Sequence, residues 1–338
     1  MRNQRRNAMV LAGALAALVV VALVVIFSGE EEDQTVSMAR ANWSSGYMQA
    51  EIYAQLIGEL GYTVTDPADH TLSPYSFYPA LDSGQYDLWA NGWFPTHDIF
   101  LTSETAAGLE YDRSIEAVGQ QVESGALQGY MIDKATADAM GITSMSQLEN
   151  PSVAAVFDRD GDGLADLVGC NVGWGCEAII DDHIAELGWG DNVEQVSGSY
   201  GALMQGVQER VAAGDPVLFY AWTPNWTYEA LAPGVDAVWL ESPALEDDEG
   251  ATEVRGLAGC AGNPCNLGWP VNSIRAVANS EFLDDKSDIR RLLEQVQIPL
   301  GDIAAQNAKA NPDAKADAAA WIADNRALVD IWLTNARG

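Results

Sequence analysis

The chain has 338 residues, 48% of them apolar, which is enough for two domains of ordinary size with buried cores. Its net charge is −32, so its surface repels nucleic acid and anionic lipid, and partners of both kinds are excluded. We interpret the charge as an adaptation to solubility in high salt, where ions screen the repulsion between carboxylates. The alternative is an acidic surface that attracts cationic ligands.

The first segment has the composition of an export signal or a membrane anchor. Residues 1–6 are basic, residues 8–27 are apolar without a break, and residues 28–33 are polar and acidic. The apolar run is long enough to cross a bilayer, and no small-residue cleavage site ends it. We therefore favour an uncleaved anchor over a cleaved signal peptide, and in either case the rest of the chain is predicted to lie outside the cytoplasm.

Outside the cytoplasm, the four cysteines are expected to form disulfides. They fall into two local pairs, Cys170/Cys176 and Cys260/Cys265. The alternative is a zinc site with four thiolate ligands. Such sites usually have C-x2-C spacing, whereas the gaps here are five and four residues.

Strands and helices alternate after the charged linker. Strands are predicted over residues 36–39, 62–65 and 86–90, and helical segments over residues 44–60 and 78–81. Gly61 is expected to end the first helix. This order is typical of a parallel sheet, in which ligands bind beyond the carboxyl ends of the strands. Trp93 and His97 follow the third strand, so we expect them at such a place.

A strand over residues 128–134 is expected to cross into a second domain. The elements predicted there are a helix over residues 178–187, a strand over 193–196, a helix over 200–211, and strands over 216–222 and 235–240. An acidic, glycine-rich excursion follows over residues 241–268. The chain then returns to the first domain over residues 267–277, and the closing helices are predicted within residues 289–296, 303–310 and 318–333.

A glycine-rich turn over residues 169–177 is bracketed by Cys170 and Cys176, with Trp174 near its tip. An apolar, helix-like run follows, so the turn is predicted to lead into a helix N-terminus. Free backbone N–H groups and the helix dipole make such an end an anion site, and the glycines let a ligand approach closely. With tryptophan beside it, the site suits a ligand that has a carboxylate at one end and an apolar or cationic group at the other.

Trp93, Trp174 and Trp222 share one context, a turn near glycine or proline at the end of a predicted strand or the start of a predicted helix. Each tryptophan face attracts a quaternary ammonium group by about 0.5–2 kcal/mol, and such a group has no N–H to leave unsatisfied. We predict that the three rings form a cage for such a cation, although a single tryptophan would more commonly fill a core. Trp226 could belong either to the cage or to the core. The tryptophans assigned to the core are Trp43, Trp89, Trp189, Trp239, Trp269, Trp321 and Trp332.

His97 is the only histidine next to the predicted site. Its side chain could donate a hydrogen bond to a ligand carboxylate, or it could hold its own loop by bonding Asp98. His70 and His183 are expected on the surface.

Residues 158–166 resemble the first part of an EF-hand calcium loop, with oxygen ligands at its first, third, fifth and ninth positions and glycine at the sixth. The twelfth position is Gly169 instead of glutamate. The alternative is a solvated acidic turn. The predicted ligands of a structural calcium ion are Asp158, Asp160, Asp162 and Asp166.

No catalytic signature accompanies these features. The sequence has no G-x-S-x-G, H-E-x-x-H or phosphate-binding P-loop motif, and the cysteines are expected to be paired. We therefore expect a binding protein and not an enzyme.

Five motifs of the chain occur in the order found in one known family. They are residues 91–98 (NGWFPTHD), 161–166 (GDGLAD), 170–177 (CNVGWGCE), 221–226 (AWTPNW) and 268–271 (GWPV). From about Val36 to its C-terminus, the chain resembles the glycine betaine/proline betaine substrate-binding proteins of osmoprotectant ABC importers.

The resemblance implies a type II periplasmic-binding-protein fold, in which two α/β lobes joined by two crossovers enclose a ligand cleft. Residues 1–35 would be the signal peptide or anchor with its linker, residues 36–128 and 268–338 the first lobe, and residues 129–267 the second. The resemblance also implies the Cys170–Cys176 disulfide. The implied ligand-binding residues are Trp93, Trp174 and Trp222 around a trimethylammonium group, and His97 with the backbone N–H groups of Gly175 and Cys176 at the carboxylate.

The sequence thus predicts a monomeric, extracytoplasmic substrate-binding protein that delivers glycine betaine or a related osmoprotectant to a membrane permease. Its only expected cofactor is the structural calcium. Choline is the alternative ligand, ranked lower because it lacks the carboxylate. Two alternatives come from other classes: an anchored choline-ester hydrolase that uses His97 and Asp98, and a calcium-dependent adhesion module built on residues 158–166.

Overall fold

The computed structural model describes residues 34–104, 110–245 and 252–338. Residues 36–338 belong to one compact unit. The predicted signal or anchor at residues 8–27 lies outside the described residues. Within the part that is described, no helix has the length and apolar character needed to cross a membrane.

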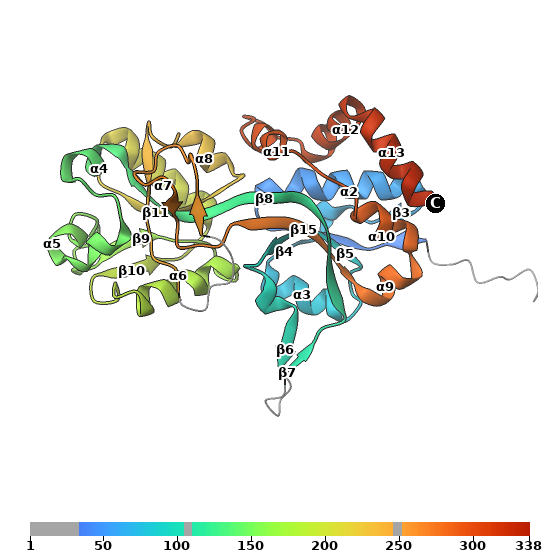
Figure 1. Cartoon of the computed structure of the whole chain (residues 1–338), viewed down its shortest axis with the longest axis horizontal. Coiled ribbons are helices and arrows are strands. Elements are labelled where there is room, and N and C mark those ends of the chain that lie inside the picture. The colour runs from blue at the N-terminus through green and yellow to red at the C-terminus, as the bar shows by residue number, and fades with distance from the viewer. Residues whose placement is uncertain (1–33, 105–109, 246–251) are drawn as a thin grey trace, which may run out of the picture. The chain divides into compact units, whose positions relative to one another are not determined.

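A mixed nine-stranded sheet organises this unit, with helices packed on both of its faces (Figure 1). Its strands, in their order across the sheet, are β10 (Val193–Val196), β9 (Ala165–Val168), β11 (Leu218–Thr223), β8 (Ile115–Asp133), β15 (Asn272–Asn279), β5 (Leu88–Phe94), β2 (Met38–Ala41) and β4 (Thr71–Leu72), with β12 (Ala237–Leu240) also paired to β8.

The prediction of a parallel sheet is only partly right. β2 runs parallel to β4 and β5, and β9 runs parallel to β10 and β11. β8, however, is antiparallel to β11, β12 and β15. Antiparallel neighbours need no crossover helix between them, and β8 extends directly from one part of the sheet into the other.

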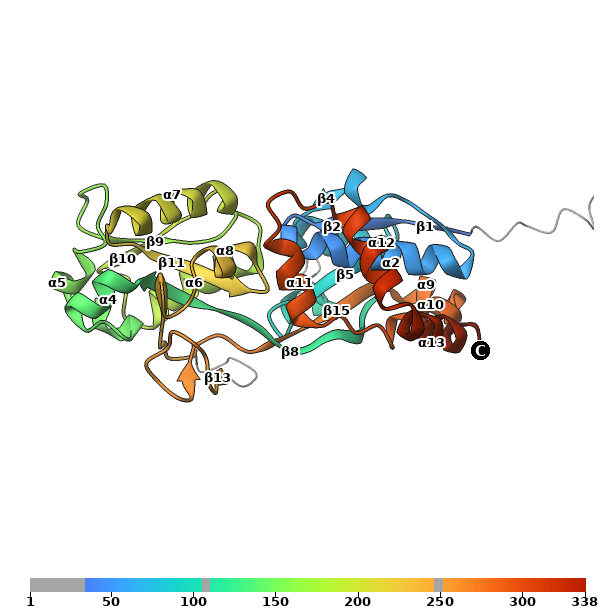
Figure 2. The same ribbon diagram turned by 90° about the horizontal axis from the view of Figure 1, so that it is seen from above.

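β8 also links the two lobes of the fold. Its residues up to Ala126 pair with β15, and those from Leu127 onwards pair with β11. Figures 1 and 2 show two groups of elements, with β8 and the segment leading into β15 running between them. This is the predicted two-lobed α/β architecture. The boundaries given above for the lobes remain a prediction.

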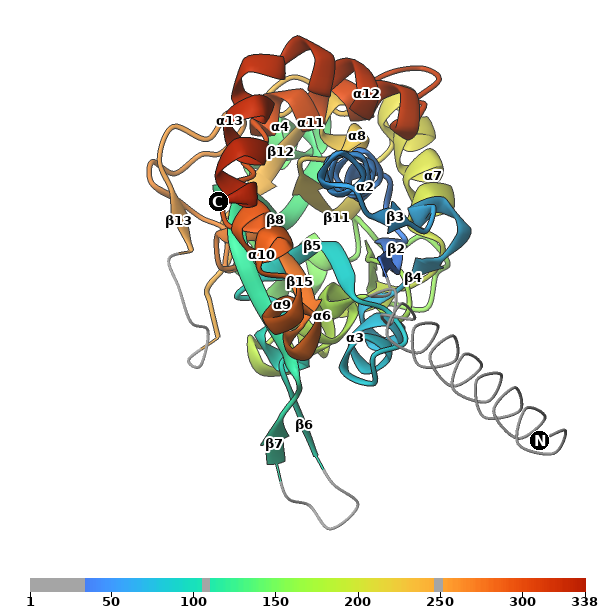
Figure 3. The same ribbon diagram turned by 90° about the vertical axis from the view of Figure 1, so that its right-hand side faces the viewer.

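The first lobe is covered by helices from both ends of the chain. α2 ends at Gly61, as predicted, because the φ of 112° at this residue favours glycine. Figure 3 shows the C-terminal helices lying over α2, and a 2.8 Å ion pair joins Arg326 to Glu59 there. The helices of this lobe are α2 (Tyr47–Leu60), α3 (Pro74–Asp82), α9 (Ser280–Asp285), α10 (Ser287–Leu293), α11 (Leu300–Asn307), α12 (Ala314–Asp324) and α13 (Arg326–Arg337).

The single helix predicted over residues 318–333 is two helices, α12 and α13, separated at Asn325. The backbone N–H and the side-chain amide of Asn325 both donate to the carbonyl oxygen of Trp321, at 3.0 and 2.9 Å, so this residue caps the end of α12. The apolar residues keep the same helical spacing through both helices. Periodicity alone therefore predicts one continuous helix.

The second lobe contains α6, which begins directly after the glycine-rich turn, as predicted. Its helices are α4 (Lys134–Met140), α5 (Pro151–Ala154), α6 (Gly175–Glu186), α7 (Tyr200–Ala213) and α8 (Trp226–Ala230). Three short strand pairs complete the described fold: β1 (Thr35–Val36) with β3 (Thr63–Val64), β6 (Thr102–Glu104) with β7 (Glu110–Asp112), and β13 (Glu253–Val254) with β14 (Cys265–Asn266).

Both predicted disulfides are present. The Cα atoms are 6.4 Å apart in Cys170–Cys176 and 6.1 Å apart in Cys260–Cys265. Because no free cysteine remains, a zinc site with thiolate ligands has no ligands to use.

The prediction that His183 lies on the surface is wrong. This residue is fully buried, and its Nδ1 atom lies 2.7 Å from the hydroxyl of Tyr130. It is three residues after the buried Ile180, so both side chains lie on the face of α6 that packs against the sheet. The counterpart prediction for His70 is confirmed, since that side chain is exposed.

Candidate ligand-binding site

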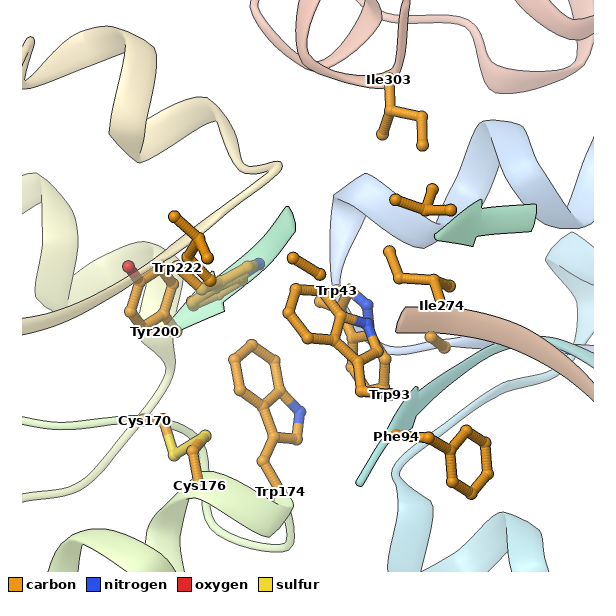
Figure 4. Packing of buried hydrophobic residues seen from close by; sticks show 14 of the residues in the cluster. Trp43, Trp93, Phe94, Cys170, Trp174, Cys176, Tyr200, Trp222, Ile274 and Ile303 are labelled. Carbon is orange, nitrogen blue, oxygen red and sulfur yellow. A yellow bond between two sulfur atoms is a disulfide. The ribbon is translucent and has the colours of Figure 1, made fainter. Parts of the chain in front are cut away.

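Aromatic rings from both lobes line one cavity, with Trp43 and Trp93 on one side and Trp174 and Trp222 on the other (Figure 4). All six residues that the sequence predicted to bind a ligand are brought together here. The lining residues are Trp43, Pro74, Trp93, Thr96, His97, Gln128, Trp174, Gly175, Cys176, Tyr220 and Trp222.

β5 supplies the first wall. This strand is buried along its whole length and continues through Phe94, so Trp93 lies within the strand and not in a loop after it. A Cβ atom at Gly92 would come within 2.6 Å of the Phe94 ring and of Val277. The strand can therefore pass between these side chains only with glycine at this position.

The second lobe supplies rings at steep angles to one another. Trp174 precedes the first residue of α6, and Trp222 lies on β11. Their ring centroids are 5.3 Å apart at an interplanar angle of 83°, and Trp174 lies 5.6 Å from Trp43 at 77°. Rings inclined in this way can present several faces to one enclosed group, which is the arrangement a cation cage needs.

The start of α6 supplies two backbone N–H groups. Gly175 and Cys176 are the first residues of this helix, so their N–H groups have no partner within it. The disulfide to Cys170 holds Cys176 in place, and the Glu177 carboxylate accepts from the N–H of Gly173 at 2.9 Å. The disulfide and this hydrogen bond together hold the turn that carries the two N–H groups.

His97 serves its own loop and also faces the cavity. Its Nδ1 atom accepts from the N–H of Trp93 at 3.2 Å, and the hydroxyl of Tyr78 lies 3.0 Å from the same atom. Burial lowers the pKa of His97 to about 3, so the ring is neutral at pH 7. A neutral ring that accepts at Nδ1 carries its hydrogen on Nε2, which makes His97 a donor.

These contacts with Trp93 and Tyr78 support the alternative in which His97 holds its own loop. Both contacts use Nδ1, so the hydrogen of the ring is on Nε2, and the residue also lines the cavity.

Three polar side chains that line the cavity are hydrogen-bonded in series. The sequence analysis did not predict them at the site. The Tyr220 hydroxyl donates to Gln128 at 2.6 Å, and the Gln128 amide donates to the Thr96 hydroxyl at 3.0 Å. Gln128 lies opposite Trp222 in the register of β8 and β11. Only this pairing between distant strands places Gln128 at the site, so no local pattern indicates it.

Trp43 was also missed, because it was assigned to the core. It is 8% exposed and lies two residues after the end of β2, at the carboxyl end of this strand. The criterion that selected Trp93 would also have selected Trp43. The core assignments of the other six tryptophans are confirmed, since each is buried; Trp226, left open, is half-buried and lines a second cavity.

The predicted calcium ligands come close together but remain a prediction. Carboxylate oxygens of Asp158, Asp160 and Asp166 lie within 4.8 Å of one another, and those of Asp160 and Asp162 group in the same way with Glu194. Backbone N–H groups already donate to several of these oxygens, for example Gly161 to Asp158 at 2.7 Å.

Two lobes with an aromatic, polar-edged cavity at their junction define a substrate-binding protein of the periplasmic-binding class. The family model described as "Substrate binding domain of ABC-type glycine betaine transport system" matches residues 34–324. The chain belongs to this family.

Relatives and solved structures agree with that assignment. The chain is 36% identical over 313 residues to the glycine betaine/proline betaine-binding periplasmic protein of Escherichia coli, covering 89% of this chain and 90% of that protein. It is 34% identical over 313 residues to the glycine betaine-binding periplasmic protein OusX of Dickeya dadantii, with 90% of each covered. An ABC-transporter choline-binding protein in complex with choline has the same fold, with a TM-score of 0.67 and 17% identity over 90% of this chain and 93% of that one.

Proposed function

We propose that this protein binds glycine betaine, or a closely related carboxylated quaternary ammonium compound, in the cavity between its lobes and delivers it to an ABC permease. The observation that carries the proposal is the convergence of Trp93, Trp174 and Trp222 with the start of α6 on one cavity. One end of the cavity suits a methylated cation and the other suits a carboxylate.

The aromatic end supports a cation without N–H groups. Among the described residues that line the cavity none is charged, so the trimethylammonium group would be held by ring faces. Each face contributes about 0.5–2 kcal/mol, and a smaller or hydrogen-bonding cation would lose hydration that the rings cannot replace. Trp43 adds a further ring to the predicted set.

The α6 end supports a carboxylate. The N–H groups of Gly175 and Cys176, the helix dipole and the Nε2–H of His97 are all donors to an anion. Choline would leave these donors without a partner, so we rank it below betaine although a structural neighbour binds it.

The family assignment supports the location and the partner. Its relatives are periplasmic, so we place this protein outside the cytoplasm, tethered or exported by residues 8–27. Ligand contacts from both lobes would stabilise a closed state, which the permease would recognise on a monomeric binding protein.

A substitution at Trp174 tests the proposal. Trp174→Ala removes a ring that contacts those of Trp43, Tyr200 and Trp222 and would contact the ligand, so betaine affinity should fall by well over about tenfold in calorimetry. Trp321→Ala is the matched control, because that ring is 8% exposed and stacks on Trp332 within the C-terminal helices. An unchanged affinity in Trp174→Ala would refute the proposal.

A further inference from the structure

The rings that the first lobe contributes to the cavity share one hydrogen-bond acceptor. The indole N–H of Trp43 donates to the Asn91 side-chain oxygen at 2.8 Å, and that of Trp93 donates to the same oxygen at 2.9 Å. An indole N–H can only donate, and most buried indole N–H groups in proteins find an acceptor. Asn91 supplies that acceptor to two tryptophans that are far apart in the sequence.

The orientation of the Asn91 amide is dictated by its other neighbours. The Asn91 nitrogen donates to the Gln49 side-chain oxygen at 2.5 Å, and the Gln49 nitrogen donates to the carbonyl oxygen of Ser45 at 2.8 Å. A backbone carbonyl can only accept, so it fixes the direction of the Gln49 amide, and Gln49 in turn fixes Asn91. The Ser45 carbonyl can only accept, and the indole N–H groups of Trp43 and Trp93 can only donate. The amides between them therefore have a single possible orientation.

Burial makes the arrangement costly to break. Gln49 is fully buried, and Asn91 and Ser45 are each 1% exposed. A Cβ atom at Gly46 would lie 3.2 Å from the Asn91 side chain, so the start of the first helical segment packs tightly against the amide. A buried donor left without a partner costs about 1–3 kcal/mol, which penalises any rotation of either indole away from Asn91.

We infer that Asn91 is the positioning residue of the cage, fixing the Trp43 and Trp93 rings in the orientation that receives the quaternary ammonium group. Asn91 is not among the residues that line the cavity, so it acts through the two rings. Because β5 alternates its side chains, Asn91 lies on the same side of the strand as Trp93, two residues away. This inference rests on the proposed function for its ligand.

The test replaces the amide with an apolar side chain of similar size. Asn91→Leu should weaken glycine betaine binding by about tenfold or more in calorimetry, because both indoles lose their acceptor. Asn279→Leu is the matched control. Asn279 is 8% exposed and makes three hydrogen bonds with its side chain at the start of α9, away from the cavity, so its variant should lose stability without losing betaine affinity.

A second readout separates positioning from general loss of structure. The chain has 11 tryptophans, each with one indole N–H signal in a nitrogen–proton NMR spectrum. Asn91→Leu should shift the signals of Trp43 and Trp93 and leave in place that of Trp321, which donates to Asp302 at 2.8 Å in the C-terminal helices. In a Trp43→Phe/Trp93→Phe background, Asn91→Leu should change affinity by less than about twofold, because no indole N–H remains to be positioned.

Wild-type affinity in Asn91→Leu, unshifted Trp43 and Trp93 signals, or an undiminished loss in the double-phenylalanine background would each overturn the inference. Its failure is distinguishable from failure of the proposed function. If the wild-type protein did not bind glycine betaine, the proposed function would fail, whereas the NMR comparison would still show whether Asn91 orients the two rings.

Discussion

At the scale of single residues, two buried histidines make the folded state less stable in acid. Burial lowers the pKa of His97 to about 3 and that of His183 to about 4, whereas an unfolded histidine titrates near 6.5. Between these values the unfolded chain binds more protons than the folded one. The contribution of both residues to stability is therefore complete above about pH 6.5 and is lost as the pH falls towards the folded pKa values.

As the pH is lowered from about 6.5 to 4, proton binding to these histidines in the unfolded chain should lower the melting temperature, and His97→Gln should remove part of this loss. His70→Gln is the control and should leave the slope unchanged, because His70 is exposed. Identical slopes in the wild type and in His97→Gln would contradict the explanation.

Sequence reasoning at this scale found residues whose chemistry is unusual and missed those whose position alone matters. Trp93, Trp174 and Trp222 were selected because each lies near glycine or proline at the end of a predicted strand or the start of a predicted helix, and because a set of tryptophan faces suits a quaternary ammonium group. Gln128 could not be selected, because it reaches the cavity only through the pairing of β8 with β11. His183 was misplaced because a polar residue in an amphipathic helix reads as exposed unless its buried partner, Tyr130, is known.

At the scale of elements, the glycine-rich turn and its disulfide hold the start of α6 ready for a ligand. The Cys170–Cys176 bond ties the end of the turn to the first residues of the helix, so the two N–H groups need little ordering when a carboxylate arrives. A site that is ordered in advance loses less entropy on binding.

Replacing both Cys170 and Cys176 by alanine should therefore weaken betaine binding by about three- to tenfold while the lobes remain folded. The matched control replaces Cys260 and Cys265, whose disulfide lies in the excursion at the start of β14, and should leave affinity unchanged. Calorimetry on both variants, with circular dichroism to confirm folding, makes the comparison. Equal affinities in the two variants would show that the disulfide at the turn does not organise the site.

Most elements could be predicted from the sequence, and the errors share a cause. α2, α7, β10 and β11 follow clear periodicity and stop signals. The extension of β5 through Trp93 was missed because glycine and asparagine usually interrupt a strand, and here Gly92 is required by the neighbouring Phe94 and Val277 side chains. The mixed sheet was missed because strand direction depends on long-range connection, which a local pattern does not contain.

At the scale of the whole molecule, the net charge of −32 should make stability depend on salt. Repulsion between the carboxylates opposes the compact state, and it is screened over about 10 Å at 0.1 M salt and about 3 Å at 1 M. We expect the melting temperature to rise when sodium chloride is increased from about 0.1 M to 1 M. Potassium chloride at equal ionic strength should give the same rise, and a constant or falling melting temperature in both salts would contradict the interpretation of the charge.

The central claim is that one cavity holds a methylated cation at its tryptophan end and a carboxylate at its α6 end. The most direct test is a calorimetric titration of residues 36–338 with glycine betaine, choline and proline in high salt. We predict tight binding of glycine betaine and weak binding of the other two, because only betaine satisfies both ends. Tight choline with weak betaine would contradict the carboxylate site at Gly175 and Cys176, and no binding of any of the three would contradict the cage itself.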